Sequence, residues 1–479
     1  MSNESLGKRA VSGFIWRLLQ NSGTQVVSFI VSIILARHLM PSDYGLVAII
    51  NVFINIANVF IQTGFSSAVI QKKDLSDTDK NTMFFSSAAM GAVLYGLLFV
   101  AAPYISSFYY EPALTNMLRV QSLVILVGSL GSVHQALITR EMKFKKSFIA
   151  GLIAMVTQSV TGLVLAFCGY GAWALIYSGL ASSVVNSVVV VAICGWMPRL
   201  TVSFQSLKNM LGFSLKMLGS ALVNSVFQNI RSLIIGKQYS SEDLAYYSKG
   251  NQFPQLIMLQ VDGAMTTVLF SALSKTQENW EQGLRGLRRA MKMSLYICAP
   301  LMAGLFAVAE PMILLLLTDK WAFATRYVQA GCVICLFWPL SAQMHALNAR
   351  GKSGVALGLN ITGKVISVLL LLLTYQHSVW LMVLSEAIAS AVTLPINMLA
   401  YRKYLDYRLR DQLQDILPPI LLSAVMAATV YSLQLLGLPL LVTLIVQIIV
   451  GIAVYVALSA ILRLDSFYYV LNMLKKQRE

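Results

Sequence analysis

The chain has few charged residues, few cysteines and few histidines. Only 12% of its 479 residues are Asp, Glu, Lys or Arg, whereas soluble globular proteins carry about 25%. This scarcity of charge excludes an ordinary soluble domain. The five cysteines include one CxxC, at Cys332 and Cys335, but no second pair accompanies it as in a zinc site. The four histidines are scattered, so we predict no metal site.

The sequence also lacks the motifs of the common enzyme classes. It contains no nucleophile elbow and no phosphate-binding loop. Its apolar segments are joined by short loops, which leave no room for a catalytic domain outside the membrane. A membrane glycosyltransferase or polymerase is therefore the least favoured class. We predict that the protein is not an enzyme and needs no cofactor.

Apolar residues, by contrast, are abundant and occur in long runs. They make up 57% of the chain, and the mean hydropathy is +0.70. A membrane-spanning helix needs about 20 such residues, and by that rule the chain holds about fourteen spans. With few alternating segments, the spans are expected to be helices. We place them at 13–38, 44–70, 82–107, 114–138, 148–168, 172–196, 208–235, 244–271, 291–317, 325–348, 354–375, 378–401, 416–436 and 439–462.

The cations alternate between loops in the way that sets membrane topology. If the N-terminus lies in the cytoplasm, most of the 36 Lys and Arg fall in cytoplasmic loops or tails. The segment from Arg140 to Lys146 and the segment from Ser274 to Arg289 are two of these basic loops. This bias predicts that both termini are cytoplasmic. It also accounts for most of the net charge of +16 without nucleic acid.

Two halves of the sequence match in nearly constant register. Ala36-Arg37 matches Gly236-Lys237, and Asp43 matches Asp243. Internal repeats are common in transporters, so we predict a duplicated architecture. The predicted parts are an N-lobe of six helices at 1–200, a C-lobe of six helices at 201–405, and two further helices with a tail at 406–479. The segment from Met197 to Lys208 is the expected linker between the lobes.

Polar residues recur at helical spacing within several spans. Asn51, Asn55 and Gln62 lie on one face of the second span. Such stripes can join helices by hydrogen bonds, but stripes on corresponding helices of both halves favour one central aqueous cavity. We predict that its lining residues are Arg17, Asn21, Thr24, Asn51, Asn55, Gln62, Lys216, Asn224, Arg231, Asn251, Gln255 and Lys364. The acids that could couple transport to an ion are Asp262, Glu310 and Glu386.

Several segments resemble a known family of bacterial exporters. ARHLMPSDYG at 36–45, GFSSAVIQ at 64–71 and ALITREMKF at 136–144 are similar to its recurring motifs. So are IIG at 234–236 and YSKG at 247–250. The family is the Wzx-type flippase branch of the multidrug/oligosaccharidyl-lipid/polysaccharide superfamily, in particular its colanic-acid and teichuronic-acid exporters.

The resemblance implies two six-helix lobes around a central cavity, with two extra helices. It implies flipping of undecaprenyl-diphosphate-linked oligosaccharides across the bacterial cytoplasmic membrane by alternating access. The expected partners are that lipid, membrane lipids, a polysaccharide polymerase and a coupling proton or sodium ion; the protein is expected to be a monomer. Gln62 and Arg231 depart from the family, because relatives often carry an acid at both places. A lipid II flippase and a multidrug cation antiporter remain alternatives.

Overall fold

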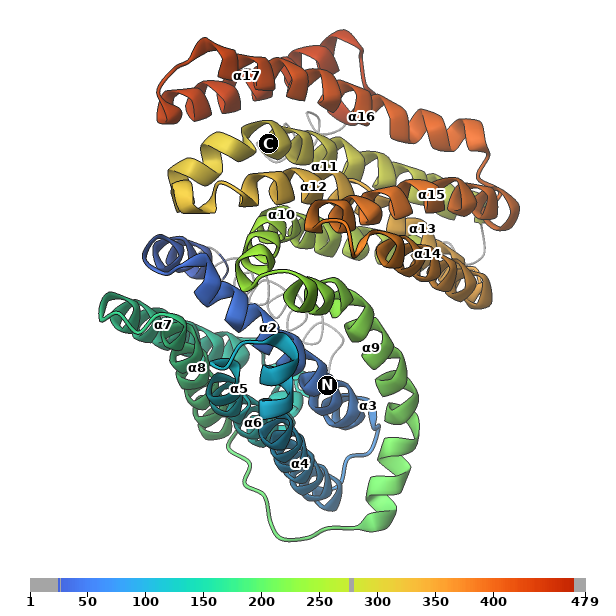
Figure 1. Cartoon of the computed structure of the whole chain (residues 1–479). Coiled ribbons are helices and arrows are strands. Elements are labelled where there is room, and N and C mark those ends of the chain that lie inside the picture. Colours follow the sequence, from blue (N-terminus) through green and yellow to red (C-terminus); the bar gives the residue numbers. More distant parts are fainter. Residues whose placement is uncertain (1–24, 26, 275–279, 469–479) are drawn as a thin grey trace. The chain divides into compact units, whose positions relative to one another are not determined.

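The computed structural model describes residues 25, 27–274 and 280–468, and every regular element in these ranges is helical (Figure 1). The predicted all-α class is confirmed. The first half contains Val27–His38, α2 (Pro41–Val59), the π-helix η1 (Phe60–Ser66), α3 (Ser67–Gln71), α4 (Asp77–Tyr109), α5 (Leu114–Gln121), α6 (Leu123–Arg140), α7 (Phe144–Phe167), α8 (Ala172–Cys194) and α9 (Phe204–Gln238).

The second half begins with α10, and short 3₁₀ turns interrupt some of its spans. It contains α10 (Ser241–Ser274), α11 (Trp280–Leu317), η2 (Asp319–Trp321), α12 (Ala324–Cys335), η3 (Trp338–Ser341), α13 (Ala342–Ala349), α14 (Ser353–Thr374), α15 (Val379–Leu405), α16 (Leu409–Ser432), η4 (Leu433–Leu436) and α17 (Leu440–Ile461). Each predicted span beyond the first coincides with part or all of one of these helices, or with a series of them interrupted by at most two residues.

Eleven helical stretches in the described part of the chain are long and apolar enough to cross a membrane. The protein is therefore a multi-pass membrane protein. Three further predicted spans correspond to Val27–His38, which is apolar but short, and to α9 and α10, which are long but are not among the eleven. Both α9 and α10 carry polar residues near their middle, such as Asn224 and Asn251. The predicted number of about fourteen spans is therefore approximate.

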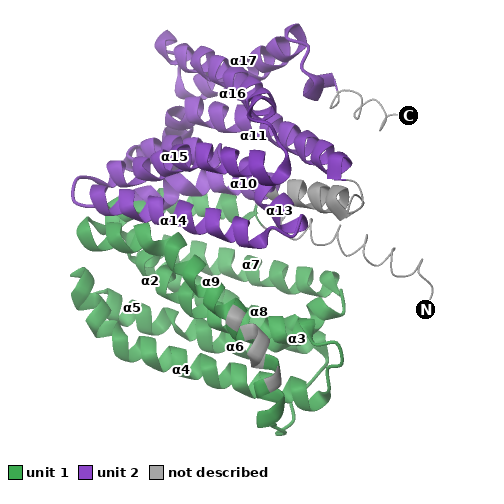
Figure 2. Cartoon of the chain, turned by 90° about the vertical axis from the view of Figure 1, so that its right-hand side faces the viewer, with its two compact units in different colours: residues 1–245 green, residues 246–479 purple. Residues whose placement is uncertain are grey.

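The chain divides into two compact units, Met1–Ala245 and Tyr246–Glu479 (Figure 2). Unit 1 includes α9, which packs along α2, η1 and α4. The division concerns packing in this conformation, whereas the lobe boundary predicted at residue 200 concerns the internal repeat. That boundary stays a prediction.

Asp43 and Asp243, which match in the two halves of the sequence, accept similar hydrogen bonds at the starts of α2 and α10. The Asp43 carboxylate accepts a hydrogen bond from the backbone N–H of Met40 at 3.0 Å. The Asp243 carboxylate accepts one from the Ser240 hydroxyl at 2.8 Å, and the same hydroxyl accepts one from the Asp243 backbone N–H at 3.0 Å. Such contacts satisfy backbone groups that a helix start leaves unpaired. The two aspartates thus hold equivalent positions, as the sequence register requires.

Helices of unit 1 approach one another closely at glycines. A Cβ on Gly91 of α4 would overlap the Ser129 side chain of α6, and one on Gly45 of α2 would overlap the backbone of Ser241. Small residues let membrane helices pack backbone against backbone. At one end of α3, α4 and α6, Val69, Met83 and Val133 form the centre of a buried apolar cluster.

Unit 2 is organised around the packing of α11 on α16. One of its buried clusters includes Leu287, Met291 and Leu295 of α11, together with Ile416 of α16. A charged network borders this cluster. Arg288 and Lys292 of α11 both contact the Asp415 carboxylate, at 2.7 and 3.0 Å. Apolar packing and a fully enclosed carboxylate therefore fix the same pair of helices.

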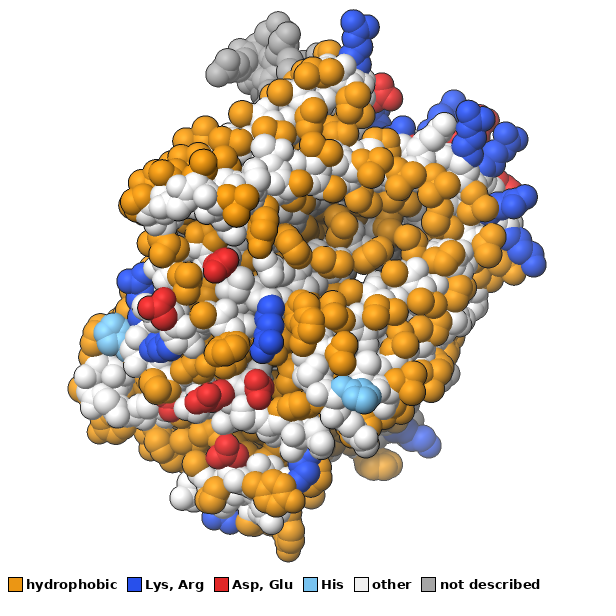
Figure 3. Space-filling view, turned by 45° about the horizontal axis from the view of Figure 1, so that its top comes forward, with side chains coloured by type: hydrophobic (Ala, Val, Ile, Leu, Met, Phe, Trp, Pro, Cys, Tyr) orange, Lys and Arg blue, Asp and Glu red, His pale blue; other side chains and the backbone are white. Residues whose placement is uncertain are grey.

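The outward faces of several helices are mostly apolar. On α7, Ile153, Val156, Val160 and Val164 are exposed and repeat at helical spacing. The exposed side chains of α17 are likewise isoleucine, leucine and valine over most of its length. Hydrophobic side chains also cover most of the face shown in Figure 3. Surfaces of this kind suit contact with lipid tails, in agreement with the membrane assignment.

Candidate functional site

One helical span in unit 1 exposes polar side chains, in contrast to the mostly apolar outward faces of α7 and α17. Between Pro41 and Val69 three residues are exposed, and all three are polar: Asn51, Asn55 and Gln62. Their neighbours Ile50, Val52 and Ile54 are buried. An exposed polar side chain at the depth of a span needs water or a polar partner, because lipid tails offer no hydrogen bonds. This face of α2 and η1, which we call the α2 polar face, therefore has the character of an aqueous surface.

The helix carrying this face changes its winding where Gln62 lies. Residues 60–66 form a π-helix, which is rare and occurs often at functional sites. Ile61, Gly64 and Phe65 are buried there while Gln62 is exposed. A π-turn adds a residue to each turn and shifts the register of everything after it. The shift keeps Gln62 exposed while Phe65 and Val69 enter the apolar cluster of α3, α4 and α6.

A second polar stripe lies on α9, which packs against α2 and η1. Ser220, Asn224 and Gln228 are exposed and are spaced four residues apart, so they share one face. Arg231, predicted on the same face, is buried and only 7% exposed. The side chain of Lys216 lies outside the described residues. Unit 1 thus presents polar residues on two neighbouring helices, as a cavity wall requires.

Two of the predicted residues of unit 2 lie close to α12. The Asn251 side chain lies next to Gly331, where an added Cβ would stand 2.7 Å from its Oδ1 atom. Glu386 of α15 is half-buried and lies within electrostatic range of the buried Cys335. Lys364 on α14 is also half-buried, and α14 packs on α15. The predicted proximity of Lys364 and Glu386 stays a prediction.

The remaining predicted residues divide into exposed ones and undescribed ones. Gln255 on α10 and Glu310 near the end of α11 are exposed. Arg17, Asn21 and Thr24 lie outside the described residues, as does the side chain of Asp262. Their roles stay predictions.

Sequence patterns did not reveal a contact at one end of α9. The Lys237 ammonium donates a hydrogen bond to the carbonyl of Phe108 at the end of α4. The same ammonium lies 4.3 Å from the centre of the Phe108 ring and 4.0 Å from that of Tyr110. The Tyr109 hydroxyl donates to the Leu233 carbonyl at 3.4 Å. The match of Lys237 with Arg37 was the available signal, but it did not indicate which rings the cation meets.

A second missed feature is the complete enclosure of Asp415. Its carboxylate accepts hydrogen bonds from Arg288 at 2.7 and 3.1 Å and from the Tyr407 hydroxyl at 2.5 Å. Burial and the Asp415 carboxylate raise the pKa of the Tyr407 phenol, which lies in the turn between α15 and α16. The phenol therefore stays protonated and acts only as a donor. Asp415 and Arg288 are 127 residues apart, so no spacing rule pairs them.

Comparisons with known proteins agree with the resemblance found in the sequence. The model of the family described as "Polysaccharide biosynthesis protein" matches residues 34–326. The succinoglycan biosynthesis transport protein ExoT of Rhizobium meliloti is 28% identical over 310 residues, which are 64% of this chain and 63% of that protein. This chain therefore matches less than two thirds of that relative's length.

Two further similarities extend over most of the chain. The teichuronic acid biosynthesis protein TuaB of Bacillus subtilis is 22% identical over 447 residues, covering 90% of each protein. Among solved structures, the lipid II flippase MurJ in an inward closed conformation has a TM-score of 0.73 at 16% identity. That comparison covers 92% of this chain and 98% of the other, and at this identity it shows the fold alone. The family match extends over more than half of the sequence, and this chain belongs to the polysaccharide biosynthesis protein family, as the resemblance to Wzx-type flippases predicts.

Proposed function

We propose that the protein is a flippase that carries undecaprenyl-diphosphate-linked oligosaccharides across the bacterial cytoplasmic membrane. This proposal rests on the α2 polar face. Between Pro41 and Val69 the exposed residues of this span are all polar, which suits a hydrophilic cargo, whereas most exposed residues of α7 and α17 are apolar and suit lipid. The names of the relatives ExoT and TuaB, which refer to succinoglycan transport and teichuronic acid biosynthesis, support the same class of cargo.

The chemistry of the polar stripes matches that of a sugar. Asn and Gln side chains each offer donors and an acceptor, as sugar hydroxyls require. Asn51 and Asn55 lie one helical turn apart, and Asn224 and Gln228 repeat the same spacing on α9. These residues would contact successive sugar units without selecting one hydroxyl pattern. A diphosphate, in contrast, calls for cations.

We assign the diphosphate to the cations of the matching halves. Arg17 and Lys216 occupy corresponding places in the repeat and would meet the two phosphates as the lipid enters from the cytoplasm. The lipid tail would stay in the membrane while the sugars occupy the polar stripes. Movement of the repeats then exposes the cargo on the other side. Asp262, Glu310 and Glu386 are the acids available to bind a coupling proton or sodium ion.

The cellular setting follows from the charge of the loops. Both termini face the cytoplasm under this proposal, because the basic loops then lie inside. The protein acts as a monomer, without a cofactor and without catalysis. A polysaccharide polymerase on the outer face would consume the flipped lipid.

The test is to replace the wild-type protein by a variant and identify the lipid that accumulates. Asn51→Leu combined with Asn55→Leu removes two of the three residues of the α2 polar face and changes exposed residues only. Asn116→Leu, at an exposed position on α5, is the matched control. We expect the double variant to reach the membrane at normal levels, to lose polymer export and to accumulate an undecaprenyl-linked oligosaccharide on the cytoplasmic leaflet. Normal export by the double variant, or accumulation of lipid II instead, would refute the proposal.

A further inference from the structure

The linker between α8 and α9 exposes a row of large apolar side chains. Residues 195–203 form no helix. Met197, Leu200, Val202 and Phe204 are exposed to 68, 90, 62 and 79%. We call these four residues the linker strip. A soluble surface seldom carries so many large apolar groups together, and a cluster of this kind marks contact with another apolar phase.

The opposite side of the linker is fixed to the start of α4. Asn81 donates from Nδ2 to the Thr201 hydroxyl at 2.6 Å and accepts from the Arg199 backbone N–H at 3.0 Å. The Ser203 backbone N–H donates to the Thr82 hydroxyl at 3.0 Å. Asn81 and Thr82 are themselves buried. Polar groups of the linker thus turn toward α4, while the apolar side chains point away from it.

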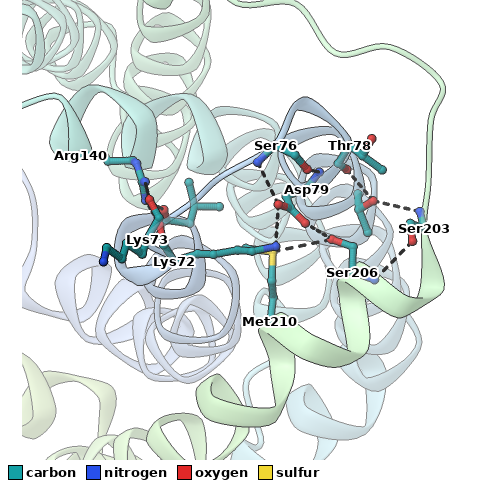
Figure 4. Close-up of polar contacts among 11 residues, drawn as sticks. Lys72, Lys73, Ser76, Thr78, Asp79, Arg140, Ser203, Ser206 and Met210 are labelled. Atoms are coloured by element: carbon teal, nitrogen blue, oxygen red, sulfur yellow. Dashed lines mark hydrogen bonds and ion pairs between the residues drawn. The ribbon is translucent and has the colours of Figure 1, made fainter.

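The first turn of α9 continues this attachment. The Ser206 hydroxyl donates to the Asp79 carboxylate (Figure 4). Asp79 also pairs with Lys72 at 2.6 Å and accepts from the Ser76 backbone N–H at 2.9 Å. The middle and the C-terminal end of the linker are therefore held by the N-terminal turns of α4. These hydrogen bonds hold the exposed linker strip in a defined position on α4.

The attachment also sets the height of the strip relative to the membrane. The spanning helix α4 begins at Asp77, so Asn81 and Thr82 lie about 6 to 7.5 Å inside its start at about 1.5 Å per residue. The charged residues Asp77, Asp79 and Lys80 precede this level and an apolar run follows it, so it lies close to where the helix passes from headgroups to lipid tails. Two exposed cations accompany the strip: Arg199 lies within it and Lys208 follows it. The strip thus combines apolar side chains with positive charge at the membrane boundary.

We propose that the linker strip is a lipid-binding surface that inserts into the boundary between headgroups and tails of an anionic leaflet. Apolar side chains on an interfacial segment enter that boundary, and neighbouring Lys and Arg attract anionic headgroups. The charge and the height of the strip favour lipid over a protein partner. The strip anchors the N-terminus of α9 to the membrane surface. The inference does not depend on which cargo the protein carries.

The test places a nitroxide at Leu200 or Val202 of the full-length protein after Cys168→Ser and Cys194→Ser. In bilayers containing phosphatidylglycerol, oxygen should relax both labels and a water-soluble nickel complex should not. A label at Lys143, a half-exposed loop position, is the control and should respond to nickel. Arg199→Gln with Lys208→Gln should make the strip labels shallower in these bilayers but not in neutral phosphatidylcholine.

Relaxation of both strip labels by the nickel complex in anionic bilayers would overturn the proposal. Shielding that arises only after native membrane proteins are added would also overturn it, because it would assign the strip to a protein partner. Loss of export in the Asn51→Leu, Asn55→Leu variant has no bearing on these readings, so the two proposals can fail separately.

Discussion

Neutralising Asp415 is expected to weaken the packing of α16 on α11. The Asp415 side chain is fully buried, and it meets Arg288 at 2.7 Å and Lys292 at 3.0 Å. Asp415→Asn keeps the shape of the side chain but removes its charge. The two cations would then share a buried amide that can accept from only one oxygen. Tyr407 would lose its charged acceptor as well.

The size of the effect follows from how far each partner is exposed. Removing one member of a buried ion pair costs about 3–5 kcal/mol. Here Arg288 and Lys292 are 29 and 33% exposed, and Arg288 also lies 3.5 Å from Asp411. Water and Asp411 can therefore compensate the cations in part. We expect a loss of about 2 kcal/mol, which corresponds to a fall in Tm of about 4–8 °C for a unit of this size.

The assay is thermal unfolding of the purified protein in detergent, with Asp77→Asn as the matched control. Asp77 forms an exposed pair with Lys80 and is itself 82% exposed, so its neutralisation should leave Tm within about 1 °C. Arg288→Gln added to Asp415→Asn should cost less than the two single changes together, because both belong to one network. Equal melting of the Asp415 and Asp77 variants would refute the reasoning.

Three further outcomes are expected. Gly45→Ala should sharply reduce the yield of folded protein, because the new Cβ would overlap the backbone at the start of α10. Gly96→Ala is the control and should fold normally, because no atom lies within 4 Å of its new Cβ. Equal yields of the two variants by size-exclusion chromatography would contradict this. Arg140→Gln should lower Tm by several degrees because the guanidinium donates to the carbonyls that end α3, at 2.9 Å for the first of them, and Lys143→Gln should not. In a Cys168→Ser background, which removes an exposed native thiol, a cysteine at Ser107 should react with an impermeant maleimide from outside the cell and one at Lys143 should not; the reverse pattern would invert the proposed topology.

The spans could be predicted because their signal is local. Runs of about 20 apolar residues are long enough to identify a helix in a membrane without knowing its neighbours. The same residues do not encode the π-helix at 60–66, because its register is set by the packing of Phe65 and Val69 against other helices. The polarity of α9 was visible in the sequence, but its close packing along α2 and η1 was not.

The site could be predicted only where periodicity and exposure coincide. Asn51, Asn55 and Gln62 form one face in the sequence and one exposed face in the structure. Arg231 continues the polar stripe of α9 in the sequence, yet it is buried in the structure. At that position α9 packs against its neighbours, which the spacing of polar residues does not reveal. The Asp415 network joins residues 127 positions apart, and no spacing rule connects them. Long-range pairing of this kind depends on the tertiary fold.

The most direct test of the account measures transport itself. Purified protein would be reconstituted in proteoliposomes with a fluorescent undecaprenyl-diphosphate-linked oligosaccharide, and membrane-impermeant dithionite would report the fraction of the label on the outer leaflet. The account predicts that the wild-type protein and Asn116→Leu equilibrate the lipid between leaflets, while Asn51→Leu with Asn55→Leu leaves it where it was placed. Equal translocation by the wild-type protein and the double variant, or none by the wild-type protein, would contradict the assignment of the α2 polar face as the path of a lipid-linked sugar.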